Sequence, residues 1–246
     1  MIPKTIHYCW FGRGELPPLA KKCIASWRQF FPDYEIKEWN EDNFDVNCIP
    51  YTADAYKVGK YAFVSDYARF WVLYHFGGVY FDTDVEVIRP MDDVLDKGPF
   101  MGFELLGECP AVNPGLGLAA VPGMSLYKAA LNRFEQLSFL TENGRLNPYT
   151  MIPMVTDLLK EMGLTGKGAI EQLAGITIYP SDWFNPFDDA TGWLRKTENT
   201  RTIHWYAKSW LPAEPVWIIG VKRVLRRIIG KEAIQRLGML LKKGKR

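Results

Sequence analysis

The order of apolar and polar residues along the chain predicts an α/β fold. Residues 4–12 (KTIHYCWFG) begin with a short alternating run, which favours a strand. Residues 17–32 carry apolar side chains at helical spacing between prolines, and residues 34–40 (YEIKEWN) return to an extended pattern. Strand, helix and strand in this order are the beginning of an α/β fold.

A long helix is expected from about residue 54 to 76, with an apolar stripe that includes Phe63 and Tyr67. The glycine pair at 77–78 ends it, because glycine is the usual residue past a helix C-terminus, and a strand follows at once. Residues 113–123 (NPGLGLAAVPG) are rich in small side chains, which favours close approach of the backbone to another group. Further strands are expected within residues 99–105, 175–187 and 202–210, a turn and short helix within residues 89–95, and further helices within residues 124–137 and 146–163.

The composition is that of an ordinary soluble protein. The chain has 246 residues, 48% of them hydrophobic and 24% charged, which suits one large domain. Its four cysteines are scattered without a CxxC pair, which argues against a structural zinc site and favours a reducing compartment. The first residues show no secretory signal pattern, and no apolar stretch approaches the ~18 residues of a membrane span. We therefore expect a cytoplasmic protein.

The C-terminal segment is strongly basic. Residues 221–246 contain ten Lys and Arg against Glu232 alone, a net charge of +9, which leaves −7 on the rest of a chain whose total is +2. This asymmetry predicts a body over residues 1–212 and a basic amphipathic helical tail over residues 213–246. Either the tail packs its apolar side on the body, or this side lies in an anionic membrane surface, which we favour. Nucleic acid is a weaker partner, because no aromatic residue follows Trp217.

Three acidic residues interrupt the apolar segment FGGVYFDTDVEV at 76–87. Asp82, Asp84 and Glu86 would share one face if the strand continued, and two carboxylates about 6 Å apart repel by roughly 2–3 kcal/mol. A solvated edge strand is the simpler explanation of a bare DxD. The apolar flanks instead favour a central strand, whose carboxyl end binds ligands in open α/β sheets. We expect Asp82 and Asp84 to hold a divalent cation that binds a diphosphate, with Glu86 in a structural role.

Five further residues are candidates for such a site. Asp66 and Arg69 lie at i and i+3 of the aromatic helix, where they form either a salt bridge or a clamp for sugar hydroxyls. His204 is either a hydrogen-bonded structural residue or a metal ligand, and Lys208 is a candidate phosphate contact. Trp10 is either a core residue or a platform for a nucleobase.

Several segments, taken together and in order, resemble the DXD-containing sugar transferases of glycosyltransferase family 32: IPKTIHYCWFG, FPDYEIKEWN, SDYARFWVLYHFGGVYFDTDVEVIRP and IHWYAKSW. The resemblance covers roughly residues 1–212, and SDxxRxxxLxxxGGxYxDxD is its most specific part. This family includes fungal mannosyltransferases and bacterial capsule transferases. The resemblance implies a GT-A fold, in which a Rossmann-like mixed sheet is flanked by helices, and a metal-dependent, retaining enzyme.

The resemblance also implies roles for the candidates named so far. Asp82 matches the first family aspartate, which lies near the ribose and the metal, and Asp84 matches the second, a direct metal ligand. Asp66 and Arg69 match the pair that holds the donor sugar. Trp10 matches the tryptophan that stacks on the base.

Five C-terminal or peripheral positions complete the implied site. Asn43 matches an asparagine near the nucleotide, and His204 matches the C-terminal metal ligand. Ser209 and Trp210 match the pair that closes over the diphosphate. Lys208 stands before this serine, unlike the more usual family text, and we infer that it reaches the diphosphate.

The resemblance therefore predicts a glycosyltransferase that uses Mn²⁺ or Mg²⁺. It would move a hexose or N-acetylhexosamine from a nucleotide-sugar, a UDP-sugar in this interpretation, to a glycan or lipid-linked glycan acceptor in surface polysaccharide synthesis such as that of a capsule. The enzyme is expected to be peripheral on the inner face of the cell membrane. A non-catalytic nucleotide-sugar-binding module is one alternative. An aspartyl phosphatase is a weaker one, because Glu86 stands where such enzymes carry Thr or Val.

Overall fold

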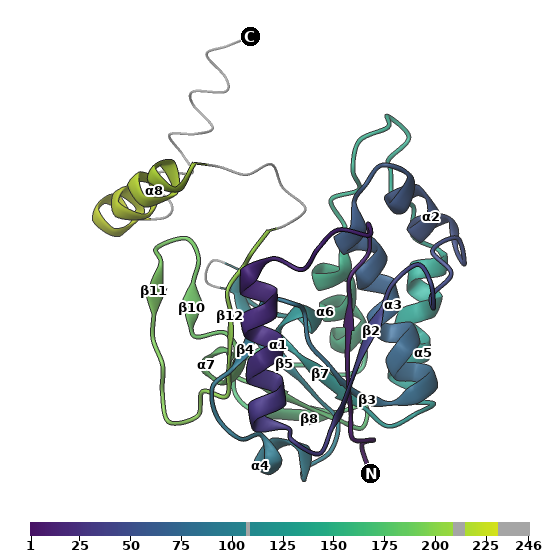
Figure 1. Cartoon of the computed structure of the whole chain (residues 1–246), viewed down its shortest axis with the longest axis horizontal. Coiled ribbons are helices and arrows are strands. Elements are labelled where there is room, and N and C mark those ends of the chain that lie inside the picture. Colours follow the sequence, from purple (N-terminus) through teal and green to yellow (C-terminus); the bar gives the residue numbers. More distant parts are fainter. Residues whose placement is uncertain (107–108, 209–214, 231–246) are drawn as a thin grey trace.

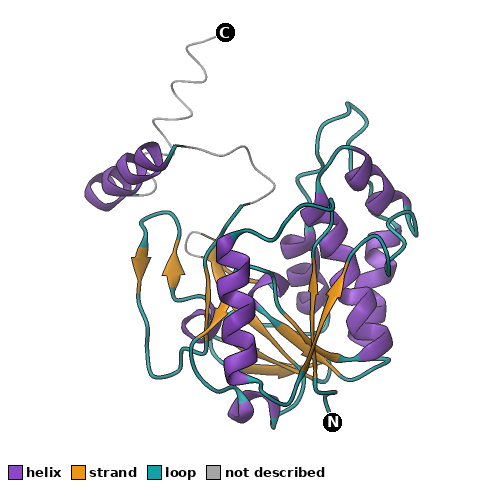
Figure 2. Ribbon diagram, viewed as in Figure 1, coloured by secondary structure: helices purple, strands orange, loops and turns teal. Residues whose placement is uncertain are grey.

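The computed structural model describes residues 1–106, 109–208 and 215–230. Its centre is a mixed sheet of eight described strands with helices on both faces (Figures 1 and 2). These strands are β1 (Thr5–Cys9), β2 (Glu35–Trp39), β3 (Gly78–Tyr80), β5 (Phe100–Leu106), β6 (Cys109–Val112), β7 (Leu118–Ala120), β8 (Glu171–Leu173) and β9 (Ile176–Tyr179). Their order is β2-β1-β3-β7-β5-β9-β8, with β6 paired to β5. The predicted α/β class is confirmed.

Two apolar cores hold the helices against the sheet. The helices are α1 (Pro18–Phe30), α2 (Pro50–Lys57), α3 (Tyr61–Phe76), α4 (Asp92–Leu95), α5 (Ser125–Glu135), α6 (Met151–Glu161) and α7 (Ser181–Phe184), with a 3₁₀ turn η1 at Pro114–Leu116. Successive residues of a strand point to opposite faces. Tyr80 therefore packs in the core that α2, α3, α5 and α6 cover, whereas Val79 and Phe81 pack in the core that α1, α4 and α7 cover.

The prediction of one helix over residues 54–76 is wrong in its first part, because the structure has two helices, α2 and α3, in this region. Gly59 lies between α2 and α3 in the left-handed region, with a φ of 69°, and its N–H donates to Tyr56 O at 2.9 Å. This conformation suits glycine and ends α2. The end of α3 agrees with the prediction, because Gly77 has a φ of 65° and donates to Leu73 O at 2.9 Å.

The DTD segment forms a turn between strands of two different sheets. Beyond it, β4 (Val85–Val87) pairs antiparallel with β12 (Thr202–His204) and not with the central sheet. The Val85 N–H donates to Asp82 O at 3.0 Å and closes the turn. Glu86 lies on β4, where its Oε2 accepts hydrogen bonds of 2.8 Å from both Lys22 and Trp205. The three acidic residues therefore do not form one row, and the contacts of Glu86 agree with its predicted structural role.

A buried histidine ties the strands to the end of α3. His7 of β1 accepts a hydrogen bond of 3.1 Å on Nδ1 from Trp39 Nε1, and its Nε2 lies 3.0 Å from Gly77 O. Because Nδ1 accepts, the proton resides on Nε2 and is donated to the carbonyl. Burial lowers the pKa of this imidazole from 6.5 to about 4, so the ring is neutral.

The C-terminal part of the described chain leaves the sheet. A short hairpin of β10 (Phe187–Asp188) and β11 (Trp193–Leu194) lies beside α8 (Val216–Ile229), as Figure 1 shows. Gly230 ends α8 with a φ of 83°. The predicted boundary between residues 212 and 213, and residues 231–246 of the predicted tail, lie outside the described residues. In the ranges that the structure covers, no helix combines the length and apolar character needed to cross a bilayer.

Candidate functional site

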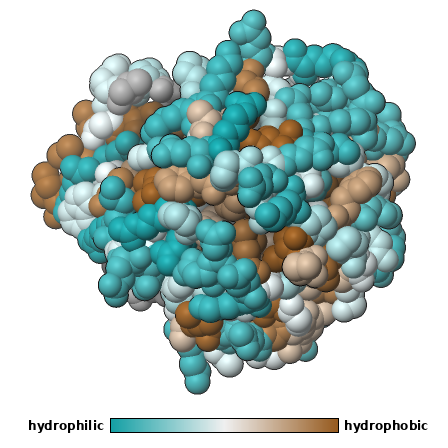
Figure 3. All heavy atoms as spheres, turned by 60° about the horizontal axis from the view of Figure 1, so that its bottom comes forward, coloured by the Kyte–Doolittle hydropathy of each residue, from teal (hydrophilic) through white to brown (hydrophobic). Residues whose placement is uncertain are grey.

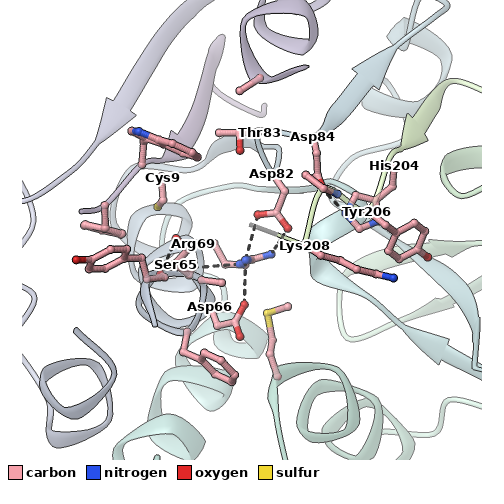
Figure 4. A pocket seen from close by; sticks show the side chains of 18 of the residues that line it. Cys9, Ser65, Asp66, Arg69, Asp82, Thr83, Asp84, His204, Tyr206 and Lys208 are labelled. Carbon is pink, nitrogen blue, oxygen red and sulfur yellow. Dashed lines mark hydrogen bonds and ion pairs between the residues drawn. The ribbon is translucent and has the colours of Figure 1, made fainter. Parts of the chain in front are cut away.

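A buried arginine joins two of the predicted aspartates. Arg69 projects from α3, and its Nη2 lies 3.0 Å from Asp66 Oδ1 and 3.1 Å from Asp82 Oδ1 (Figure 4). Its Nη1 donates to Asp82 Oδ2 at 3.2 Å, and its Nε donates to Ser65 O at 3.1 Å. Tyr80 OH also donates to Asp82 at 3.2 Å. The predicted i, i+3 pair thus supplies two of the three residues of an ion cluster that spans a helix and the DTD turn.

The charges of this cluster balance each other only in part. The Arg69 side chain is 3% exposed. Burial disfavours its charge, but Asp82 and the other anionic groups outweigh burial and raise the pKa of the guanidinium. Burial raises the pKa of Asp66 to about 7 against the opposing effect of Arg69. Burial also raises the pKa of Asp82, and the nearby Asp84 adds to this effect. A further cation at Asp82 would therefore relieve unfavourable charge.

The second aspartate of the DTD turn meets the C-terminal strand. Asp84 Oδ1 lies 3.2 Å from His204 Nε2, and Asp84 Oδ2 accepts from the Ala207 N–H at 2.7 Å. Burial acts against the charge of both side chains, but their mutual attraction outweighs it, so the pKa of Asp84 is lowered and that of His204 is raised. The register of β4 and β12 sets this contact, because His204 lies opposite Val85.

Asp82, Asp84 and His204 fit a divalent cation. One ligand atom from each lies within 4.8 Å of the others. Carboxylate oxygens and an imidazole nitrogen are suitable ligands for Mn²⁺ or Mg²⁺. In addition, His204 Nδ1 is buried without a hydrogen-bond partner, which is costly unless another group satisfies it. The structure thus brings together the three residues predicted as metal ligands.

A cavity of about 580 Å³ opens over this cluster. Its lining includes the ionic side chains of the cluster and of the possible cation site, namely Asp66, Arg69, Asp82, Asp84 and His204. It also includes Trp10, Glu104, Asn113, Tyr206 and Lys208. Trp10 lines this cavity and is half-buried against the core that includes Val79 and Phe81. Its Nε1 donates to Gly14 O at 2.6 Å. This volume suits a ligand of the size of a cofactor.

Three other predicted residues remain, of which the structure describes only Asn43. Asn43 is exposed and does not line the cavity; it holds a turn by accepting from the Asn40 N–H at 2.9 Å and donating to Glu38 O at 2.8 Å. Ser209 and Trp210 lie outside the described residues. The structure therefore assigns none of these three to the cavity.

Lys208 lines the cavity at the end of a strained loop. Its Nζ pairs with Asp189 of the segment between β10 and β11. Tyr206 and Lys208 have φ values of 51° and 50°, in the left-handed region that non-glycine residues rarely adopt. The hydrogen bond from the Ala207 N–H to Asp84 holds this loop. Strain of this kind persists where surrounding contacts determine the conformation, which is common at functional sites.

Sequence reasoning missed a polar network on the cavity wall. The buried Glu104 of β5 accepts on Oε2 from Asn113 Nδ2 at 2.7 Å and from Tyr206 OH at 3.0 Å. Asn113 also accepts from the Gly115 N–H at 2.7 Å, and a Cβ on Gly115 would lie 2.5 Å from Asp82 Oδ2. The expected close approach of residues 113–123 is thus confirmed. The glutamate within the apolar segment PFMGFEL was the available signal for this network.

Comparisons with known proteins agree with the resemblance stated for the sequence. Residues 17–101 match the family described as "Glycosyltransferase sugar-binding region containing DXD motif". This segment is therefore similar to the sugar-binding region of DXD-containing glycosyltransferases. It includes Asp66, Arg69, Asp82 and Asp84, whereas His204 lies beyond it.

The relatives share part of their length with this chain. Inositol phosphoceramide mannosyltransferase 1 of Schizosaccharomyces pombe is 29% identical over 111 residues, which are 41% of this chain and 33% of that protein. Among solved structures, "PaToxG Glycosyltransferase" has a TM-score of 0.52 at 18% identity, over 65% of this chain and 69% of that one. A glycosyltransferase involved in the glycosylation of the major capsid of PBCV-1 has a TM-score of 0.50 at 12% identity, over 83% of this chain and 94% of that one. These similarities show that the fold is that of GT-A glycosyltransferases, as predicted.

Proposed function

We propose that this protein is a metal-dependent glycosyltransferase that uses a nucleotide-sugar donor. The observation that carries the proposal is the DTD turn, where Asp82 is held by Arg69 while Asp84 meets His204 beside one cavity. The family that residues 17–101 match supports the same class of reaction. We further propose a UDP-sugar as donor, with a hexose or N-acetylhexosamine as the transferred group and Mn²⁺ or Mg²⁺ as the ion.

In this proposal, different residues of the cavity bind different parts of the donor. Asp66 and Arg69 are placed to hold hydroxyls of the sugar, because both line the cavity and Arg69 is fixed by two carboxylates. The Trp10 ring offers a face on which the nucleobase stacks. Lys208 supplies a positive charge for the diphosphate. To reach the diphosphate, Lys208 has to leave its present partner, Asp189.

The chemistry follows from the charge that develops on the diphosphate. Asp82, Asp84 and His204 would hold the cation, which would supply positive charge to stabilise the departing diphosphate. In the transfer we propose, the bond from the anomeric carbon to the diphosphate oxygen breaks, and a bond to an acceptor hydroxyl oxygen forms on the same face. The hydroxyl proton passes to the departing diphosphate. The rigid Arg69 cluster keeps the sugar oriented while this occurs.

The acceptor we propose is a glycan or a lipid-linked glycan of surface polysaccharide synthesis, such as capsule synthesis. This assignment extends the family's chemistry to an acceptor class, and it places the protein in the cytoplasm at the inner face of the cell membrane. The basic C-terminal segment supports this location, because polybasic segments are attracted to anionic lipid.

A panel of nucleotide-sugars tests the proposal. Purified protein should hydrolyse at least one donor slowly in the presence of Mn²⁺ or Mg²⁺, and EDTA should abolish the reaction. Asp84→Asn should lower the rate by at least about a hundredfold, since it removes a charged ligand of the ion. The exposed Asp33→Asn is the matched control and should behave as wild type. Donor binding without hydrolysis or transfer would instead identify a non-catalytic nucleotide-sugar-binding module.

A further inference from the structure

The last described helix turns its basic side toward the body of the protein. Arg223 Nη2 lies 3.1 Å from Asp189 Oδ1, and Arg227 Nε donates to Thr191 O at 2.7 Å. Arg226 Nη1 lies 3.4 Å from Ala190 O. These partners belong to the segment between β10 and β11. Arginine side chains therefore make these polar contacts between helix α8 and the body.

The apolar side of α8 consequently faces outward. Trp217, Val221, Val224 and Ile228 follow each other at the three- and four-residue spacing that aligns side chains on one face of a helix. Their exposed fractions are 71%, 51%, 49% and 77%. Of the two arrangements that the sequence allows, packing of this side on the body is thus wrong for the described part of the tail.

The neighbouring hairpin extends this apolar surface. On β11, Trp193 and Leu194 are 42% and 40% exposed, and the Arg227 guanidinium lies 6.0 Å from the Trp193 ring. Figure 3 shows apolar atoms at the left edge of the molecule, the side on which Figure 1 places α8 and β11. Contiguous exposed apolar surface on a soluble protein marks an interaction site.

We propose that the outward face of α8, with Trp193 and Leu194, docks on an anionic phospholipid surface. The choice of lipid rests on charge: residues 221–246 carry ten basic residues against one acidic residue. An amphipathic helix with Trp and Ile on one side and Lys and Arg on the other lies in the plane of such an interface. A protein partner would not need so many cations of one sign, whereas anionic headgroups attract such a cluster. Arg223, Arg226 and Arg227 are part of this count and also contact the body.

One carboxylate connects this surface to the candidate site. Asp189 accepts both from Arg223 of α8 and from Lys208, which lines the cavity. The segment between β10 and β11 thus contacts both α8 and a residue of the cavity wall. This deepens the proposed function and rests on it: a lipid-linked acceptor lying in the same membrane would reach the cavity without leaving the bilayer.

Vesicle flotation tests the docking surface directly. Wild-type protein should float with vesicles of phosphatidylcholine and phosphatidylglycerol and only weakly with phosphatidylcholine alone, and added salt should reduce binding. Ile228→Glu should lower the partition coefficient by at least about tenfold, because it places a charge in the apolar face. Ile170→Glu is the matched control: Ile170 is 50% exposed outside α8, and the change in net charge is the same. This control should bind as wild type.

Three results would overturn the inference. One is equal flotation of Ile228→Glu and wild type, and another is no preference for anionic vesicles. The third is a dimer in light scattering that Ile228→Glu dissociates, without flotation, which would assign the face to a second copy of the chain. Donor hydrolysis measured without vesicles keeps the two proposals apart, since flotation without hydrolysis refutes the function alone and hydrolysis without flotation refutes the docking alone.

Discussion

Gly115 offers a sharp test of how tightly the DTD turn is held. A Cβ at this position would lie 2.5 Å from Asp82 Oδ2 and 2.9 Å from Asn113 Oδ1, whereas ordinary contacts begin at 3.4 Å. Gly115→Ala therefore forces the Asp82 carboxylate to move by about 0.9 Å, the difference between 2.5 and 3.4 Å. The backbone itself adds no strain, because the φ of Gly115 is outside the left-handed region. The effect of the substitution therefore passes through its side-chain contacts, of which that with Asp82 is the shortest.

The displaced carboxylate cannot turn away freely. Arg69 and Tyr80 hold both of its oxygens through hydrogen bonds of 3.2 Å. We expect overpacking to lower the free energy of unfolding by about 1–3 kcal/mol. A misplacement of nearly 1 Å at a reacting centre costs up to about a hundredfold in rate, so the kcat of donor hydrolysis should fall by about ten- to a hundredfold.

Three measurements check this expectation: urea denaturation for stability, calorimetric titration with Mn²⁺ for metal affinity, and donor hydrolysis for kcat. Gly14→Ala is the control, because Gly14 lines the same cavity but has no atom within 4 Å of an added Cβ. If Gly115→Ala matched Gly14→Ala in both Mn²⁺ affinity and stability, Asp82 would not be held as the structure indicates, and the reasoning would be refuted whatever the activity of the protein.

Three further predictions use other parts of the structure. The unfolded chain protonates His7 before the folded chain does, so the His7 contribution to unfolding free energy, about 3 kcal/mol, should be lost as the pH falls from 6.5 to about 4. The difference between wild type and His7→Gln in urea titrations isolates this contribution from the buried carboxyl groups, and a constant difference over this pH range would contradict it. Arg69→Met leaves Asp66 and Asp82 without their cation and should lower the free energy of unfolding by about 3–5 kcal/mol. A decrease below about 1 kcal/mol in the same urea titration would show that the cluster is not a buried unit. Trp10→Ala should raise the KM for the donor by about five- to a hundredfold with little change in kcat, and Trp10→Phe should restore most of it; an unchanged KM would remove the stacking role.

The candidate site was predictable where its residues are close in sequence. Asp66 and Arg69 share one helix face, and Asp82 and Asp84 follow it after the glycine pair, so local periodicity places all four near one strand end. His204 also agrees: it was one of two interpretations from the sequence and a metal ligand by resemblance, but neither predicted the pairing of β12 with β4 that positions it. Sequence periodicity contains no information on such long-range pairing.

The parts of the fold that were missed are short or interrupted. Strands β7, β8, β10 and β11 have two or three residues each, too few for alternation to be recognised. Gly59 was passed over because a single glycine leaves the apolar helical pattern on both sides intact. Glu104 was passed over because its partners, Asn113 and Tyr206, lie on other segments and are brought to it only by the fold.

The pairing of β4 with β12 also sets the order in which the site is assembled. Asp84 and Ala207 are 123 residues apart in sequence yet share a hydrogen bond. During synthesis from the N-terminus, the Asp66–Arg69–Asp82 cluster is available to form as soon as the chain has passed the DTD turn, because its contacts are local. The proposed cation site also needs residue 204, so it requires closure of a loop of about half the chain, from Asp84 to His204. An incomplete nascent chain can therefore form the arginine cluster before it contains all three residues of the proposed cation site.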